Sequence, residues 1–103
     1  MTKQEQFIAD YEKKNIIDRF EIHDAWKKGL YELAKNNPCA TVRDQKTTPG
    51  TCCPCVVFER DGYRAVGYLH SDSLRPAMYL GNEYMSMDYR IMLDVLRGHF
   101  GVA

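Results

Sequence analysis

The chain opens with apolar residues at helical spacing behind a capping motif. Thr2-Lys3-Gln4-Glu5 places a hydroxyl acceptor three residues ahead of a glutamate, which is the order of a capping box. Phe7, Ile8 and Tyr11 follow at steps of one and three. The pattern predicts a helix over residues 3–14.

A longer apolar stripe follows at steps of four, four, three and one residues. It runs through Ile22, Trp26, Leu30, Leu33 and Ala34. Asp18 is a candidate N-cap, and Asn37-Pro38 is a stop signal because the residue before a proline avoids helical geometry. We therefore expect a second helix from Asp18 to about Asn36, with Gly29 allowing another element to pack closely against it.

The period then changes from helical to alternating around an Asp-Gly pair. Two runs of β-type residues, 56–60 and 63–69, flank Asp61-Gly62. Such a pair between two such runs is the strongest short-range signal of a hairpin, because a type I′ turn needs two positive φ angles. The turn sets the register and places Glu59 opposite Arg64 as an expected cross-strand ion pair.

Both faces of the expected hairpin are partly apolar. Val56, Phe58, Ala65 and Leu69 share one face, and Cys55, Val57, Val66 and Tyr68 share the other. One face must cover the core, and the other needs helices, a partner or a second copy of the chain. We therefore expect a homodimer.

Shorter signals complete the order of elements. Ala40-Thr41-Val42 predicts a strand before the hairpin, and residues 76–80 predict a short edge strand because a proline suits an edge. A last helical stripe runs through Met85, Tyr89, Met92, Leu93 and Leu96. It predicts a third helix over residues 86–97, with Ser86 as N-cap and Gly98 just past its end.

Helices and strands are therefore segregated along the chain, which indicates an α+β fold. We expect two N-terminal helices, an antiparallel three- to four-stranded meander with a tight Asp61-Gly62 hairpin, and a C-terminal helix. The 103 residues fit a single domain that spans residues 1–103.

Composition narrows the classes of function. The chain has 14 basic and 14 acidic residues, so it lacks the positive footprint of a nucleic-acid binder. No apolar run approaches the roughly 18 residues of a membrane helix, and the first residues lack the apolar core of a secretory signal. We expect a cytoplasmic protein with reduced thiols that binds neither nucleic acid nor membranes.

Three of the four cysteines lie between Thr51 and Cys55. Cys52-Cys53-Pro54-Cys55 resembles the C-G-P-C motif of thioredoxin-type oxidoreductases, and the resemblance implies a redox-active pair. That motif opens a helix, whereas here it leads into Val56-Val57-Phe58, which is typical of a strand. The preferred interpretation is therefore free cysteines that pack like small apolar residues, with no cofactor.

Two other uses of the cysteines stay open. A zinc-stabilised binding module would take its ligands from Cys39, Cys52, Cys55 and one of His23, His70 or His99, with His70 the foremost. A thiol enzyme or redox protein would use Cys53 or Cys55 with His70 as base, followed by Asp72 as an orienting acid.

The segment from Leu74 to Met87 carries the main functional hypothesis. It is rich in tyrosine and methionine, which, like arginine, are enriched at interface cores, and the chain shows no phosphate loop, dinucleotide fingerprint or hydrolase motif. We therefore predict a non-enzymatic regulator or inhibitor that acts by protein–protein contact, a kind of small neutral domain common in phages and other mobile elements. The expected contact residues are Arg75, Met78, Tyr79, Tyr84 and Met87.

Overall fold

The computed structural model describes residues 1–71 and 73–102. Over this part of the chain, the helices are α1 (Lys3–Glu12), α2 (Ile16–Ala34) and α3 (Tyr89–Phe100). The strands are β1 (Ala40–Arg43), β2 (Cys55–Arg60), β3 (Tyr63–Tyr68), β4 (Met78–Leu80) and β5 (Glu83–Met85). The α+β class and the antiparallel meander are confirmed, and the sheet has five strands where the sequence predicts three to four.

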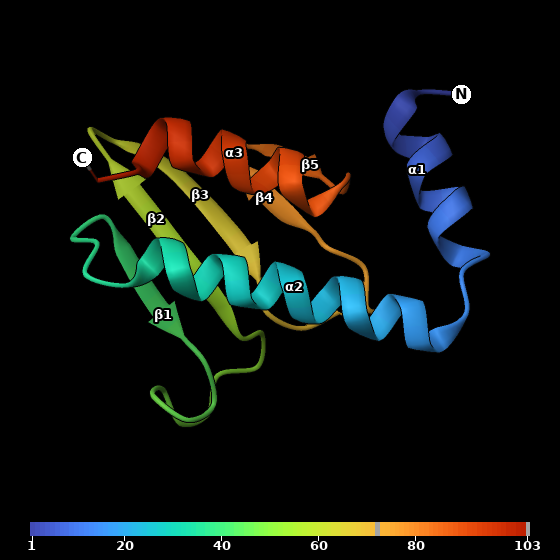
Figure 1. The fold of residues 1–103 in the computed structure, drawn as a ribbon. Coiled ribbons are helices and arrows are strands. Elements are labelled where there is room, and N and C mark those ends of the chain that lie inside the picture. The colour runs from blue at the N-terminus through green and yellow to red at the C-terminus, as the bar shows by residue number, and fades with distance from the viewer. Residues whose placement is uncertain (72, 103) are drawn as a thin grey trace.

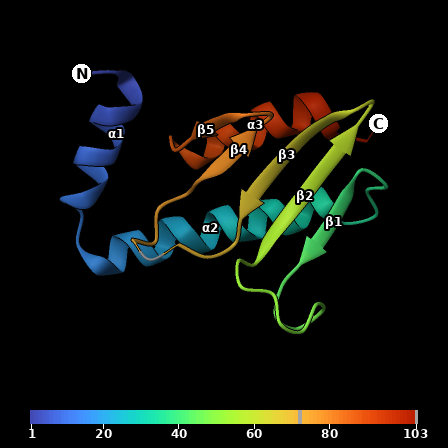
Figure 2. The same ribbon diagram turned by 180° about the vertical axis from the view of Figure 1, so that it is seen from behind.

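The sheet and two helices form two layers. The strands lie in the order β1-β2-β3-β4-β5, and each is antiparallel to its neighbour. Helices α2 and α3 cross one face of the sheet side by side (Figure 1), and the view from behind shows the other face without a helix over it (Figure 2). Helix α1 stands at the end of the molecule where α2 begins (Figure 1).

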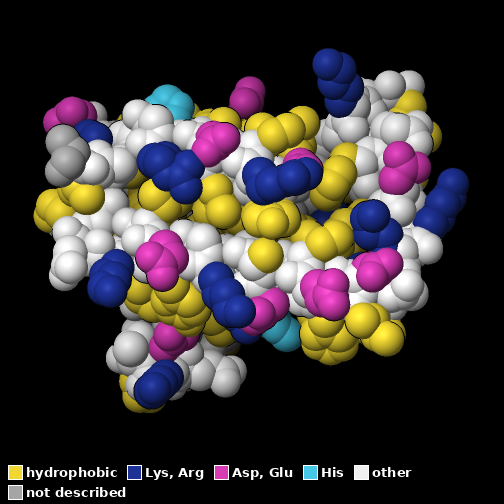
Figure 3. Space-filling view, in the orientation of Figure 1, with side chains coloured by type: hydrophobic (Ala, Val, Ile, Leu, Met, Phe, Trp, Pro, Cys, Tyr) yellow, Lys and Arg dark blue, Asp and Glu magenta, His cyan; other side chains and the backbone are white. Residues whose placement is uncertain are grey.

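The surface on the helix side mixes both signs of charge. Figure 3 shows basic and acidic side chains interspersed with apolar ones across this side. Within residues 1–71 and 73–102, no helix has both the length and the apolar character that crossing a membrane requires.

The central hairpin has the predicted register. Asp61 and Gly62 adopt φ angles of 53° and 81°, so both turn residues lie in the left-handed region. Glu59 stands opposite Arg64, as expected. The predicted ion pair between them is wrong, because none within 4 Å joins these two side chains in the described structure. Both are exposed, and a surface pair gains little in water.

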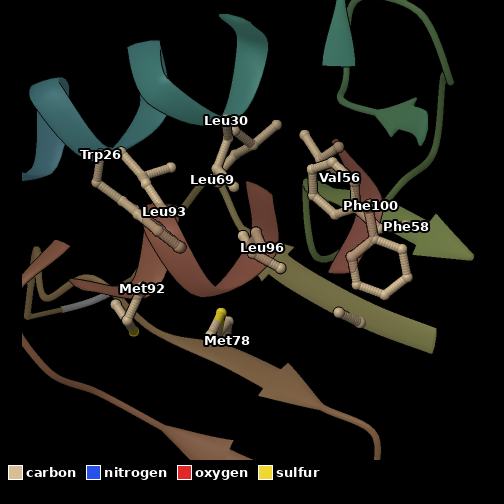
Figure 4. Packing of buried hydrophobic residues seen from close by; sticks show 11 residues of the cluster. Trp26, Leu30, Val56, Phe58, Leu69, Met78, Met92, Leu93, Leu96 and Phe100 are labelled. Carbon is tan, nitrogen blue, oxygen red and sulfur yellow. The ribbon is translucent and has the colours of Figure 1, made fainter. Parts of the chain in front are cut away.

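The core fills the space between the sheet and the two helices (Figure 4). Its fully or nearly fully buried members include Trp26, Leu30, Val56, Phe58, Ala65, Met78, Met92, Leu96 and Phe100. The Trp26 indole N–H donates to the backbone oxygen of Tyr68 at 2.9 Å, so its one polar atom is satisfied. A Cβ on Gly29 would lie 2.3 Å from a methyl carbon of Leu93, which confirms that this glycine admits a close neighbour.

The helix starts correct two sequence expectations. Helix α1 begins with the expected capping box, but α2 begins at Ile16 because the side chain of Asn15, not Asp18, accepts the capping N–H. Helix α3 begins at Tyr89, where Asp88 accepts from the Arg90 N–H. Ser86 does not cap α3, because it is buried and its hydroxyl donates to the Pro76 oxygen at 2.7 Å.

Further boundaries differ near the C-terminal end of the chain. Gly98 lies inside α3 rather than after it, since the helix continues to Phe100. Strand β4 is an inner strand rather than an edge, because β5 pairs with it and forms the edge. Three residues are too few for a strand to be evident from alternation, so β5 depends on its pairing with β4.

Candidate functional site

The face of the sheet opposite α2 and α3, called the open face below, carries alternate residues of every strand. The register joins one residue from each strand into a line across this face. That line is Thr41, Val57, Val66, Tyr79 and Tyr84. Because alternate side chains of a strand point to opposite faces, Arg43, Cys55, Glu59, Arg64 and Tyr68 share the open face with the line.

Three tyrosines of the open face, Tyr68, Tyr79 and Tyr84, form a tyrosine row over β3, β4 and β5. The rings of Tyr68 and Tyr79 lie 6.2 Å apart at 75°, and those of Tyr79 and Tyr84 lie 5.5 Å apart at 64°. These are edge-to-face contacts, which add stabilisation beyond simple burial. Tyr79 sits in the middle of the row and keeps 39% of its surface exposed.

Arg75 fixes one end of the tyrosine row. Its guanidinium donates through Nη2 to the Tyr84 hydroxyl at 3.1 Å and through Nε to the Ser86 hydroxyl at 2.9 Å. Ser86 in turn donates to the backbone oxygen of Pro76. The Tyr84 ring is therefore held by a connected set of hydrogen bonds, which reduces the side-chain entropy that any contact made by this ring would cost.

A hollow of about 830 Å³ lies beside the tyrosine row. Val66, Tyr68 and Tyr79 form its apolar wall, and Arg64 and Glu83 line it as charged residues. Aromatic, aliphatic and charged side chains therefore line the same hollow, and protein interfaces combine these residue types.

Comparisons of this chain with family models, with curated proteins and with solved structures found no match.

The structure separates the five contact residues predicted from the sequence. Tyr79 and Tyr84 lie on the open face, whereas Arg75 holds Tyr84 in place. Met87 is half-buried against the core. Met78 has no exposed surface, because the alternate residue of β4 points toward the helices, so a partner cannot touch it in this fold.

Sequence reasoning did not count Val57, Val66 and Tyr68 among the contact residues. The register of the Asp61-Gly62 hairpin was the available signal, because it puts these three on one face. The missing step was the pairing of β4 on β3, which brings Tyr79 opposite Val66.

The structure also places the cysteines, all four of which are free thiols. The Cys39 oxygen accepts from the Glu59 N–H, at the opposite end of β2 from Cys55. Four strand residues span roughly 13 Å, so Cys39 and Cys55 cannot ligate one metal ion here. Within the described ranges, no group of three or more His, Cys, Asp or Glu side chains is placed to hold a metal ion.

The other cysteines surround the start of β2, which begins at Cys55. Cys52 and Cys53 are exposed, whereas Cys55 is 8% exposed and lies beside Tyr68 in the register. Burial raises the pKa of the Cys55 thiol by more than the positive charges of Arg43 and Arg64 lower it, so Cys55 is disfavoured as a nucleophile. Asp72, the expected orienting acid, lies outside the described residues.

Proposed function

We propose that this chain is a small non-enzymatic protein-binding domain, a regulator or inhibitor that holds a protein partner on its open face. The observation that carries the proposal is the tyrosine row, whose central ring, Tyr79, lies against a hollow of about 830 Å³. Tyrosines in such central, preorganised positions are frequent hot spots of protein interfaces.

The opposite face explains why the open face is available. Helices α2 and α3 already cover the side of the sheet that bears Val56, Phe58 and Ala65. The open face keeps Val57 and Val66 half-buried and Tyr79 exposed, so it presents apolar surface with no element of the described chain over it. Apolar surface grouped in this way marks an interaction site.

A protein partner fits this face better than a nucleic acid does. Its charged residues are Arg43, Arg64 and Glu59, and Glu83 adds an acid at the hollow, so the two signs balance. A nucleic-acid surface needs clustered positive charge for the phosphates. It also needs ring faces on which bases stack, whereas the rings of the row meet edge to face.

Replacing Tyr79 by alanine tests the proposal. A tagged Tyr79→Ala variant is compared with the unmodified chain in affinity capture from native cells, with captured proteins quantified by mass spectrometry. We expect at least a tenfold loss of the captured partner, because a central interface tyrosine contributes about 2 kcal/mol or more. Circular dichroism checks that the variant is folded.

Ile91→Ala supplies the matched control. Ile91 is 50% exposed on α3, in the helix layer, so its loss removes exposed apolar surface elsewhere. Partner capture by this variant should match that of the unmodified chain. Equal capture by the Tyr79 variant, or an equal loss in both variants, contradicts the assignment of the open face. If a labelled single-stranded nucleic acid binds the unmodified chain but not Tyr79→Ala, the open face is a nucleic-acid-binding surface instead.

A further inference from the structure

A second hollow, of about 450 Å³, brings together three segments that are distant in the sequence. Helix α2 lines it with Lys27 and Tyr31, and the segment just after β3 lines it with Leu69 and His70. The loop between β1 and β2 contributes Asp44, Gln45, Cys52 and Pro54. We call it the thiol hollow. Its volume lies within the range of small-molecule sites.

Hydrogen bonds fix the walls of the thiol hollow. The Tyr31 hydroxyl donates to Oδ2 of Asp44 at 3.1 Å, which ties the loop to α2. The Leu69 N–H donates to the Pro54 oxygen at 2.9 Å, which ties the same loop to the end of β3. The loop that carries Cys52 is therefore anchored on both sides.

The thiol hollow contains both signs of charge. The backbone N–H and hydroxyl of Thr47 donate to Oδ1 of Asp44 at 2.7 and 2.8 Å. These bonds, the backbone one foremost, lower the pKa of the Asp44 carboxyl, which is ionised at neutral pH. Lys27 supplies the positive charge, and His70 lies at the same hollow. A thiol, an anion and a cation thus line one site.

We propose that the thiol hollow binds a small disulfide of the amino-acid or short-peptide type and that Cys52 forms a mixed disulfide with it. The charges match such a ligand, because Asp44 can receive its ammonium group while Lys27 receives its carboxylate. A ligand held in this way lies beside Cys52, which lines the same hollow. This site is separate from the open face, and the inference does not depend on the proposed function.

The reaction is a thiol–disulfide exchange. The Cys52 thiolate attacks one sulfur of the ligand, a new S–S bond forms, and the ligand's own S–S bond breaks. The other half of the ligand leaves as a thiolate and takes up the proton that Cys52 lost. Cys52 is oxidised, the leaving half is reduced, and the small disulfide is the only oxidant required.

Cys53 offers an internal control. It is exposed and adjacent to Cys52, but it does not line the thiol hollow. A site that binds the ligand should therefore favour Cys52, whereas simple exposure should favour neither thiol.

The experiment compares the single-site variants Cys53→Ser and Cys52→Ser. Circular dichroism first checks that each variant is folded. Both are incubated at pH 7.5 with glutathione disulfide, which is charged, or with bis(2-hydroxyethyl) disulfide, which is neutral. Mass spectrometry with peptide mapping gives the rate of adduct formation at Cys52 and Cys53. We expect Cys52 to react about fivefold faster than Cys53 with the charged disulfide, as one screened charge contact allows.

Two further results complete the test. With the neutral disulfide the advantage of Cys52 should disappear, and Lys27→Ala combined with Cys53→Ser should remove it for the charged disulfide. Equal rates at Cys52 and Cys53, or the same ratio with both disulfides, overturns the proposal. So does an advantage of Cys52 that survives Lys27→Ala, because the thiol would then be reactive without a binding site.

Discussion

At the scale of single residues, His23 has a polar atom without a partner inside the packed helix layer. Its side chain is 5% exposed, and Nε2 has no hydrogen-bond partner among the described residues. Burial lowers the pKa of His23, and the nearby Lys27 and His70 lower it further against an opposing effect of Asp24. The folded state therefore prefers the neutral imidazole.

This preference makes stability depend on pH. In the unfolded chain His23 titrates near 6.5, and in the folded chain it titrates lower. Below about pH 6.5 the unfolded state binds a proton that the folded state refuses, so the free energy of unfolding should fall as the pH drops. Urea unfolding at several pH values between 7.5 and 5 measures this free energy. The fall should be shallower in His23→Leu, which removes the titration, and an equal slope in the two proteins contradicts this account.

Residue-level signals in the sequence predicted much of the molecule but not the competition between neighbouring polar groups. Thr2 and Glu5 form the expected capping box because both are exposed and local. Ser86 is an equally good cap by sequence, but in the fold it is buried and its hydroxyl donates to the backbone oxygen of Pro76. In the structure Asp88 caps α3 instead. The hydrogen bonds that its side chain makes in the described structure are local ones to Arg90.

At the scale of elements, the close approach of α2 and α3 depends on one glycine. A Cβ on Gly29 would meet Leu93 methyl carbons at 2.3 and 2.9 Å, and Leu93 is itself in the core. Gly98, inside α3, is the contrasting position, because a Cβ there meets nothing within 4 Å.

The two glycines should therefore respond oppositely to alanine. Gly29→Ala should lower the free energy of unfolding by about 1–3 kcal/mol through overpacking. Gly98→Ala should raise it by up to about 1 kcal/mol, because alanine is the better helix former. Thermal unfolding of both variants decides this. A stabilising Gly29→Ala would show that α2 and α3 do not approach this closely.

Elements defined by local chemistry were predictable, and elements defined by contact were not. The Asp61-Gly62 turn fixed the register of β2 and β3 because both residues accept positive φ angles. Strand β5 has three residues and exists through its pairing with β4. The thiol hollow escaped sequence reasoning for the same reason, since it needs the loop of residues 44–54 to lie against α2.

At the scale of the whole molecule, two layers leave one face of the sheet without a helix over it (Figure 2). The order of helices and strands predicted the layers, and alternation predicted that both faces of the hairpin are partly apolar. Neither pattern predicts which tyrosines contact one another, because the tyrosine row depends on the pairing of β3 with β4 and of β4 with β5. The expected homodimer stays a prediction, and a second copy is one protein that could occupy the open face.

Photocrosslinking in native cells tests the central claim most directly. A benzophenone amino acid replaces Tyr79 in one version of the chain and Ile91 in a second. We predict a covalent adduct to a protein from position 79 and little or none from position 91, and an adduct of twice the mass of the chain would identify a second copy as the partner. No adduct from position 79, or adducts of equal yield from both positions, would contradict a partner-binding open face.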